Sequence, residues 1–371
     1  MKLINMGNLL VLMLMPIGGP QAVIAQERPL QRIAFGSCVL QTFDASIFDT
    51  IVNVKPDLFL MIGDIIYPDL NDDGTKLIEP WPNENSVERI KQLYAQMAAK
   101  PEYQNLRNNS PILAVWDDHD YGINDGSADF PLKAESQQLF LDFFDEPAHS
   151  ERRLTPGIYQ ARIFGPEGKR VQVILLDTRY FRTPPLRDTR SAQEKRALNI
   201  VGRYAPNEDP SATILGESQW QWLEEQLRQP AELRLLVSSY PLIPNETGRD
   251  AWGNFPLERK RLFDLIGEAG ANGVVILSGD VHFTEISQTD EGPYPMLDFT
   301  SSGMAAPSRG NENRKNSFRI SKAYADANFG MVVINWQAQP SPQVMLKAIG
   351  LDGQSVFEHQ ISLNELQVRS E

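Results

Sequence analysis

Five short segments of the chain carry side chains that bind metal ions, and each segment follows an apolar run. The residues concerned are Cys38, Asp64 with Tyr67, Asp118 with His119, Ser239 with Tyr240, and Asp280 with His282. Thiolate, phenolate, imidazole and carboxylate are the groups with which proteins hold transition metals and alkaline-earth ions. Each segment alone has an ordinary explanation, because a strand-end aspartate can also cap the next helix. Their repetition along the chain predicts a shared metal site.

The predicted elements explain how such residues meet. Five consecutive apolar residues from Leu58 to Ile62 predict a strand buried on both faces, and Gly63 allows the backbone to leave it. A strand over residues 32–38 and a helix over 45–54 precede it, which predicts a βαβ unit with parallel strands. Cys38 and Asp64 then lie at the same end of neighbouring strands, where ligands bind in open α/β sheets.

The rest of the chain alternates in the same way and then becomes rich in strands. We predict strands over 111–116, 158–164, 171–176, 233–239, 273–278, 296–300, 331–336, 343–349 and 356–363, and helices over 87–100, 132–144, 217–227 and 256–269. Residues 183–216 lack a clear period, and a loop of this length is usually functional or mobile. No break in apolar content marks a second core, so we expect one domain over 26–371 with a β-rich C-terminal part.

Composition narrows the function. The 371-residue chain has a formal net charge of −13, which disfavours binding to a nucleic-acid polymer. Residues 1–25 have the pattern of a secretory signal, with Lys2, an apolar core over 9–17 and small residues before Gln26. We therefore expect export to the periplasm or the extracellular space. No later apolar run reaches the length of a membrane span.

Cys38 is the chain's single cysteine, so it cannot form an internal disulfide. Three roles compete for it: a buried inert thiol, a lipid attachment site and a metal ligand. Charged residues, Glu27 among them, separate Cys38 from the apolar signal core and exclude lipidation. The first and third roles both remain open from the residues alone.

In this order, the five segments resemble the calcineurin-like metallophosphoesterases. Gly36-Ser37-Cys38, Asp117-Asp118-His119-Asp120 and Gly279-Asp280-Val281-His282 are most similar to the alkaline phosphatase D (PhoD-like) family, and Gly63-Asp64-x-x-Tyr67 resembles purple acid phosphatases. The resemblance covers roughly residues 32 to 340. It implies an α/β fold in which two sheets form a sandwich flanked by helices (αββα).

The resemblance also implies a ligand set. Asp64 would bridge two metals, with Cys38, Tyr67 and His282 completing the first site. Asp118 and Asp280 would build the second site, to which Asn124 or Asp117 could add oxygens. Asp118 is preferred to Asp117 because it aligns with the superfamily's ligand. Tyr240 and Asp280 stand where the superfamily has metal-binding histidines, which leaves the second site with oxygen ligands only.

The ligand types predict the metals. Phenolate and thiolate favour a highly charged transition metal, and a tyrosine that titrates near ~10 loses its proton at neutral pH only to such a cation. We therefore expect Fe³⁺ in the first site. The oxygen ligands of the second suit Ca²⁺, with Mg²⁺ or Mn²⁺ as rivals, and Zn²⁺ is a further possible substitute.

The implied activity is two-metal hydrolysis of a small phosphate ester, as an alkaline phosphatase or phosphodiesterase. His119 is the candidate to protonate the leaving group, with a structural histidine as the alternative. Arg179 could contact the phosphate or form a helix-capping ion pair. Two other functions stay open: a phospholipase-type diesterase and a calcium-binding surface module without catalysis. The sequence does not fix the oligomeric state.

Overall fold

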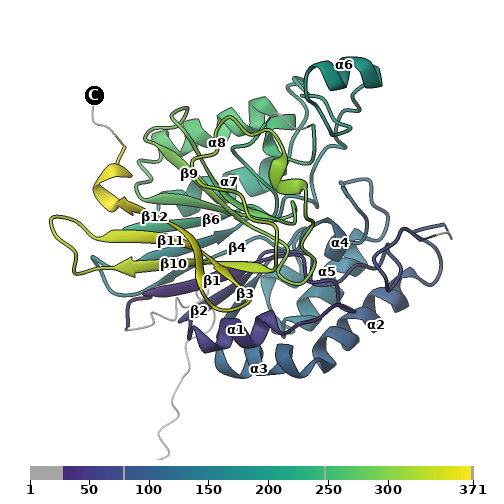
Figure 1. The fold of residues 1–371 in the computed structure, drawn as a ribbon, viewed down its shortest axis with the longest axis horizontal. Helices are drawn as coiled ribbons and strands as arrows, with labels where there is room; N and C mark the ends of the chain where they lie inside the picture. Colours follow the sequence, from purple (N-terminus) through teal and green to yellow (C-terminus); the bar gives the residue numbers. More distant parts are fainter. Residues whose placement is uncertain (1–27, 78–79, 246–247, 369–371) are drawn as a thin grey trace, which may run out of the picture.

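A computed structural model of the chain describes residues 28–77, 80–245 and 248–368, so the signal predicted over 1–25 lies outside the described residues. Two six-stranded sheets form the centre of the fold (Figure 1). The first has the order β12 (Ser355–Ser362), β11 (Gln343–Gly350), β10 (Asn328–Asn335), β1 (Arg32–Gly36), β2 (Leu58–Met61) and β3 (Ile112–Ala114). The second has the order β4 (Gln160–Phe164), β5 (Val171–Leu175), β6 (Leu233–Val237), β7 (Val274–Ser278), β9 (Met296–Ser301) and β8 (Thr284–Thr289).

Helices cover the outer faces of both sheets. The longer ones are α1 (Ile47–Asn53), α2 (Ser86–Ala99), α3 (Pro101–Asn109), α5 (Lys133–Phe143), α7 (Gly216–Leu227) and α8 (Pro256–Glu268). Figure 1 shows α1, α2 and α3 on one side of the sheets and α7 and α8 on the other. Between the sheets, Phe35 of β1 and Phe299 of β9 meet edge to face, with ring centroids 5.0 Å apart. The predicted two-sheet α/β sandwich flanked by helices is confirmed.

The βαβ prediction is also confirmed. β1 and β2 are parallel, with Ile33 opposite Leu58 and Gly36 opposite Met61, so both strands end at the same edge. In the second sheet β6 and β7 are parallel neighbours as well. The segments with the predicted metal ligands therefore follow strands of two sheets, whose carboxyl ends face a common region.

Several elements were not predicted. Helix α3 and strand β8 are absent from the sequence assignment, and the segment 183–216 contains the short helix α6 (Ala192–Ala197). Another short helix, α4 (Asp118–Tyr121), begins inside the third metal-binding segment. One cluster of buried hydrophobic side chains extends from Leu30 to Leu366, while the number of domains stays a prediction. No helix of the described residues has the length and apolarity needed to cross a membrane.

Candidate metal centre

The strands that lead to the centre end in tight corners. Cys38, Asp64, Asp280 and His282 all have left-handed backbones, with φ of 63°, 58°, 67° and 62°. For residues with a side chain this conformation costs of order 1–3 kcal/mol, and it gathers at functional sites. All four are predicted metal ligands, so the backbone strain and the predicted chemistry coincide.

Two glycines bring these corners together. A Cβ on Gly63 would lie 2.4 Å from Cβ of Asp117, and one on Gly279 would lie 2.4 Å from Oγ of Ser37. Neither contact is sterically possible, so only glycine allows the loop after β2 to approach the loop after β3, and the loop after β7 to approach the loop after β1.

The predicted ligands of the first site meet in space. Cys38 Sγ lies 3.5 Å from Oδ2 of Asp64, and the phenol of Tyr67 lies 3.3 Å from the same oxygen. Potential ligand atoms of Cys38, Asp64 and His282 lie within 4.8 Å of one another. These residues follow β1, β2 and β7; Cys38 and Asp64 are buried and His282 is half-buried.

His282 is oriented as a metal-binding histidine would be. Its Nδ1 bonds to the backbone carbonyl of Ala306, which leaves Nε2 as the available ligand atom. Burial lowers the pKa of His282, which favours the neutral form of its ring. A neutral imidazole whose second nitrogen is fixed by a carbonyl is the usual arrangement around a bound metal.

The predicted second site lies beside the first. Ligand atoms of Asp117, Asp118 and Asp280 lie within 4.8 Å of one another, as do those of Asp64, Asp118 and His119. Asp64 thus belongs to a group on each side, which is the position that a bridging ligand requires. One carboxylate oxygen of Asp117, Oδ2, is buried without a hydrogen-bond partner.

The electrostatics of the cluster favour cations. Burial raises the pKa of Asp64 well above its usual range, and the charges of Cys38 and Asp118 raise it further. Burial likewise raises the pKa of Asp280, with Asp117 and Asp118 adding to the effect. Burial also raises the pKa of Tyr67, and the negative charge of Asp64 raises it further. Buried acids that oppose each other's ionisation become stable anions when cations lie between them, so the donor set and the orphaned oxygen of Asp117 fit bound metals.

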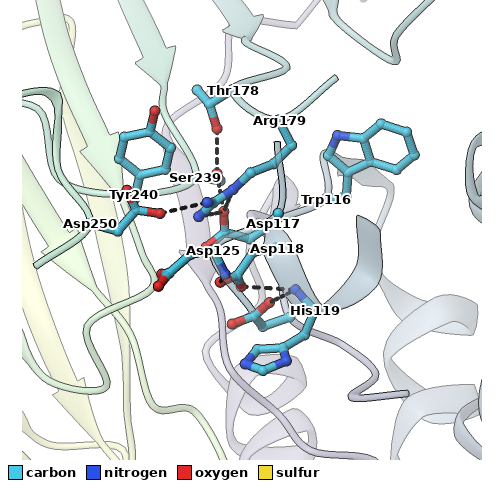
Figure 2. A network of polar contacts seen from close by, with 12 residues as sticks. Trp116, Asp117, Asp118, His119, Asp125, Thr178, Arg179, Ser239, Tyr240 and Asp250 are labelled. Atoms are coloured by element: carbon cyan, nitrogen blue, oxygen red, sulfur yellow. Dashed lines mark hydrogen bonds and ion pairs between the residues drawn. The ribbon is translucent and has the colours of Figure 1, made fainter. Parts of the chain in front are cut away.

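Arg179 belongs to a network of polar contacts with Asp117 and Asp250 (Figure 2). Its side chain is fully buried, and it donates to Asp117 over 2.7 Å and to Asp250 over 2.6 Å. The guanidinium also lies 4.6 Å from the ring centroid of Tyr240, and Arg182 adds a second ion pair to Asp250. The structure thus shows ion pairs for Arg179, which was the alternative prediction, and its contact with phosphate stays a prediction.

His119 is positioned by a carboxylate that the sequence analysis did not assign. Its Nδ1 lies 2.6 Å from Oδ1 of Asp69, and its ring lies 4.1 Å from the ring of Tyr67. Burial alone would lower the pKa of His119, but the charge of Asp69 raises it well above its usual range. The other oxygen of Asp69 accepts from the backbone N–H of Asn124, whose own predicted role as a ligand stays a prediction.

A cavity of about 490 Å³ opens beside these residues. Its lining includes Asp118, His119, Asn124, Asp280 and His282 from the predicted site. Cys38, Asp64 and Tyr67 do not line it and lie deeper. A substrate in the cavity would therefore meet the second site and His119 first.

Comparisons with known proteins show the family of the chain and its fold. The model of the PhoD-like phosphatase family matches residues 33–336. The chain belongs to this family. Alkaline phosphatase D of Bacillus subtilis (strain 168) is 26% identical over 305 residues, which cover 72% of this chain and 49% of the relative, so the chain spans about half of that protein's length. A solved structure described as the structure of PhoD has a TM-score of 0.63 at 17% identity and covers 91% of this chain and 73% of its own, which supports the same fold.

Membership of the PhoD-like phosphatase family supports phosphoester hydrolysis as the reaction class. Three acidic residues around its centre were missed by the sequence analysis. Asp69 follows Tyr67 by two residues, and Asp120 is the last acid of the third segment, where it accepts from the backbone of Ile65. Because Asp69 and Asp120 lie in or next to the motifs, their positions could have indicated that they support the site. Asp250 stands in a segment without any motif, and only the fold brings it to Arg179.

Proposed function

We propose that this protein is an exported, metal-dependent phosphoester hydrolase of the alkaline phosphatase or phosphodiesterase type. The observation that carries the proposal is the convergence of Cys38, Asp64 and His282 with the carboxylates of Asp118 and Asp280 beside one cavity. Family membership supports the reaction class, and the donor set supports the use of metals.

Cys38, Tyr67 and His282 would hold the first cation, which we assign as Fe³⁺, and Asp118 and Asp280 the second, assigned as Ca²⁺. Asp64 would be shared between them, and Asp117 offers its unpaired oxygen to the second. Bound cations would neutralise the phosphoryl oxygens and acidify the attacking water.

The remaining chemistry falls to the chain's own residues. His119 lines the cavity, and Asp69 fixes its Nδ1, so the other ring nitrogen is available to give a proton to the leaving oxygen. Arg179 and Arg182 neutralise Asp117 and Asp250 from below, and they keep the acidic loops at close range without touching the substrate.

The proposal is tested by elemental analysis of the purified protein together with hydrolysis of p-nitrophenyl phosphate and bis-p-nitrophenyl phosphate in added Ca²⁺. We expect bound iron and calcium and hydrolysis of at least one ester. Turnover of the diester alone would assign a phosphodiesterase, which includes the phospholipase-type alternative. A metal-loaded protein that is inert toward both esters would contradict the proposal and favour a calcium-binding surface module.

Iron in the first site has its own signature, because phenolate and thiolate bound to Fe³⁺ give a charge-transfer colour. A colourless and iron-free but fully active enzyme would refute the assignment of Fe³⁺ alone. Export is tested separately by sequencing the N-terminus of the protein recovered outside the cytoplasm, where we expect Gln26 as the first residue.

A further inference from the structure

Arginines line the catalytic cavity in addition to the carboxylates of the metal centre. Arg203, Arg249 and Arg314 face the same space as Asp118 and Asp280. The three arginines lie on segments that are distant in sequence and that carry none of the predicted ligands. Their shared feature is a positive charge beside the place where an ester would react.

Of these arginines, Arg314 is the one available to a ligand. Arg203 forms an ion pair with Asp125, whereas no carboxylate among the described residues lies within ion-pair distance of Arg314. The Arg314 side chain is half-buried, with its guanidinium 5.9 Å from the ring centroid of Phe283. Burial and then the charge of Arg249 lower the pKa of Arg314 to about 10. The guanidinium of Arg314 thus faces the cavity with no ion-pair partner among the described residues.

The size of the cavity shows that more than a phosphate group can enter. Its volume of about 490 Å³ lies within the range of pockets that hold whole small molecules, roughly 300–1,000 Å³. With the reacting phosphate at the metal centre, the rest of the ester would occupy the space that Arg249 and Arg314 line. A guanidinium there matches a carboxylate or a second phosphate, because its N–H groups bind either one in pairs.

We propose that this cavity selects phosphate esters that carry a second anionic group, and that Arg314, supported by Arg249, binds that group. The inference rests on the proposed function, since it requires the ester to react at the metal centre. It adds the substrate class, namely small esters with an additional carboxylate or phosphate.

The test uses glycerol 3-phosphate and 3-phosphoglycerate, which have nearly the same size and differ by a carboxylate in place of a hydroxymethyl group. We expect the wild-type enzyme to have the higher kcat/KM for 3-phosphoglycerate. Arg314→Met should lower that value by roughly 10- to 100-fold, as expected for loss of hydrogen bonds between charged groups. The value for glycerol 3-phosphate should stay unchanged. Arg314→Lys should keep part of the preference.

Arg309→Met is the matched control, because Arg309 lies on the same segment, is exposed and pairs with Asp326 instead of lining the cavity. We expect no change in either ester's kcat/KM. An equal loss on both esters in Arg314→Met would place Arg314 at the reacting phosphate and overturn the inference. So would a wild-type enzyme that hydrolyses p-nitrophenyl phosphate but does not prefer 3-phosphoglycerate, and that result would leave the proposed function standing. Absence of hydrolysis of every phosphoester by metal-loaded protein would instead overturn the proposed function itself.

Discussion

Replacing Arg179 by methionine tests whether this residue supports the centre or binds substrate. In the fold, the buried guanidinium donates to Asp117 over 2.7 Å and to Asp250 over 2.6 Å, and it packs over Tyr240. Methionine keeps an unbranched side chain of similar length but leaves Asp117 without its cation. Removing one partner of a buried ion pair costs about 3–5 kcal/mol of unfolding free energy, because the other charge stays buried.

The structure places the expected loss at the lower end of this range. Asp250 keeps its pair with Arg182, and Asp117 keeps the hydrogen bond that Ser239 donates. We therefore expect Arg179→Met to lower the unfolding free energy measured in urea by about 3 kcal/mol. At about 2 °C per kcal/mol for a chain of this size, its Tm should fall by roughly 6 °C. Both measurements are made with the same metal content in wild type and variant.

Arg228→Met is the matched control, because Arg228 also pairs with a carboxylate, Glu224, but both side chains are about half exposed. Exposed pairs contribute roughly 0–1 kcal/mol, so this variant should unfold like the wild type. A loss below 1 kcal/mol in Arg179→Met, together with a raised KM for phosphate esters, would refute the supporting role. It would return Arg179 to the phosphate contact that the sequence left open.

Three further predictions concern the site and the core. Cys38→Ser should lower the iron content of purified protein while leaving its circular dichroism unchanged, because serine is not ionised at neutral pH; unchanged iron content would make Cys38 a buried inert thiol. Asp69→Asn should lower kcat for alkyl phosphates about 10- to 100-fold, because it removes a charge-assisted hydrogen bond to His119, but it should spare p-nitrophenyl phosphate, whose leaving group needs no proton. Equal losses on both esters would argue against leaving-group protonation. Asp298 is buried in the second sheet, and burial raises its pKa from 3.8 to about 6. The protonated form of Asp298 stabilises the folded state below pH 3.8, and this contribution is lost as the pH rises through about 6. Asparagine does not titrate. The unfolding free energy of Asp298→Asn, measured in urea, should therefore rise by up to about 3 kcal/mol relative to that of the wild type between pH 4 and pH 7. A difference between the two proteins that does not change with pH would contradict this.

The sequence predicted the central strands well because they are buried on both faces. Runs such as Leu58 to Ile62 are continuously apolar, and their residues are buried as that pattern requires. Strand β8 was missed because it buries polar side chains instead: Thr284, at its start, is fully buried and donates to the carbonyl of Thr300. Helix α3 was missed because, of its nine residues, Tyr103 and Leu106 alone are buried, so the apolar period is weak.

The ligand groups were predictable for a different reason. Cys38 and Asp64 follow the two strands of one βαβ unit, so their proximity depends on local geometry that the sequence encodes. The meeting of this edge with the end of β7 depends on how two sheets pack, and residue spacing carries no information about that packing. Only the resemblance to a known family implied this packing. Neither local strand geometry nor the resemblance pointed to Asp250, so its contact with Arg179 was not predicted.

The same arrangement explains how the fold tolerates so many acids in one place. Arg179 and Arg182 offset the acids from below, at Asp117 and Asp250, where their guanidinium groups are buried and fixed. No arginine pairs with Asp64 or Asp280 among the described residues, and burial and neighbouring negative charges raise the pKa of both acids well above the usual range. Both also have left-handed backbones, a conformation that costs free energy for residues with a side chain. The fold therefore supplies cations of its own to one half of the acidic cluster, and we expect metal ions bound at the other half to stabilise the folded state as well.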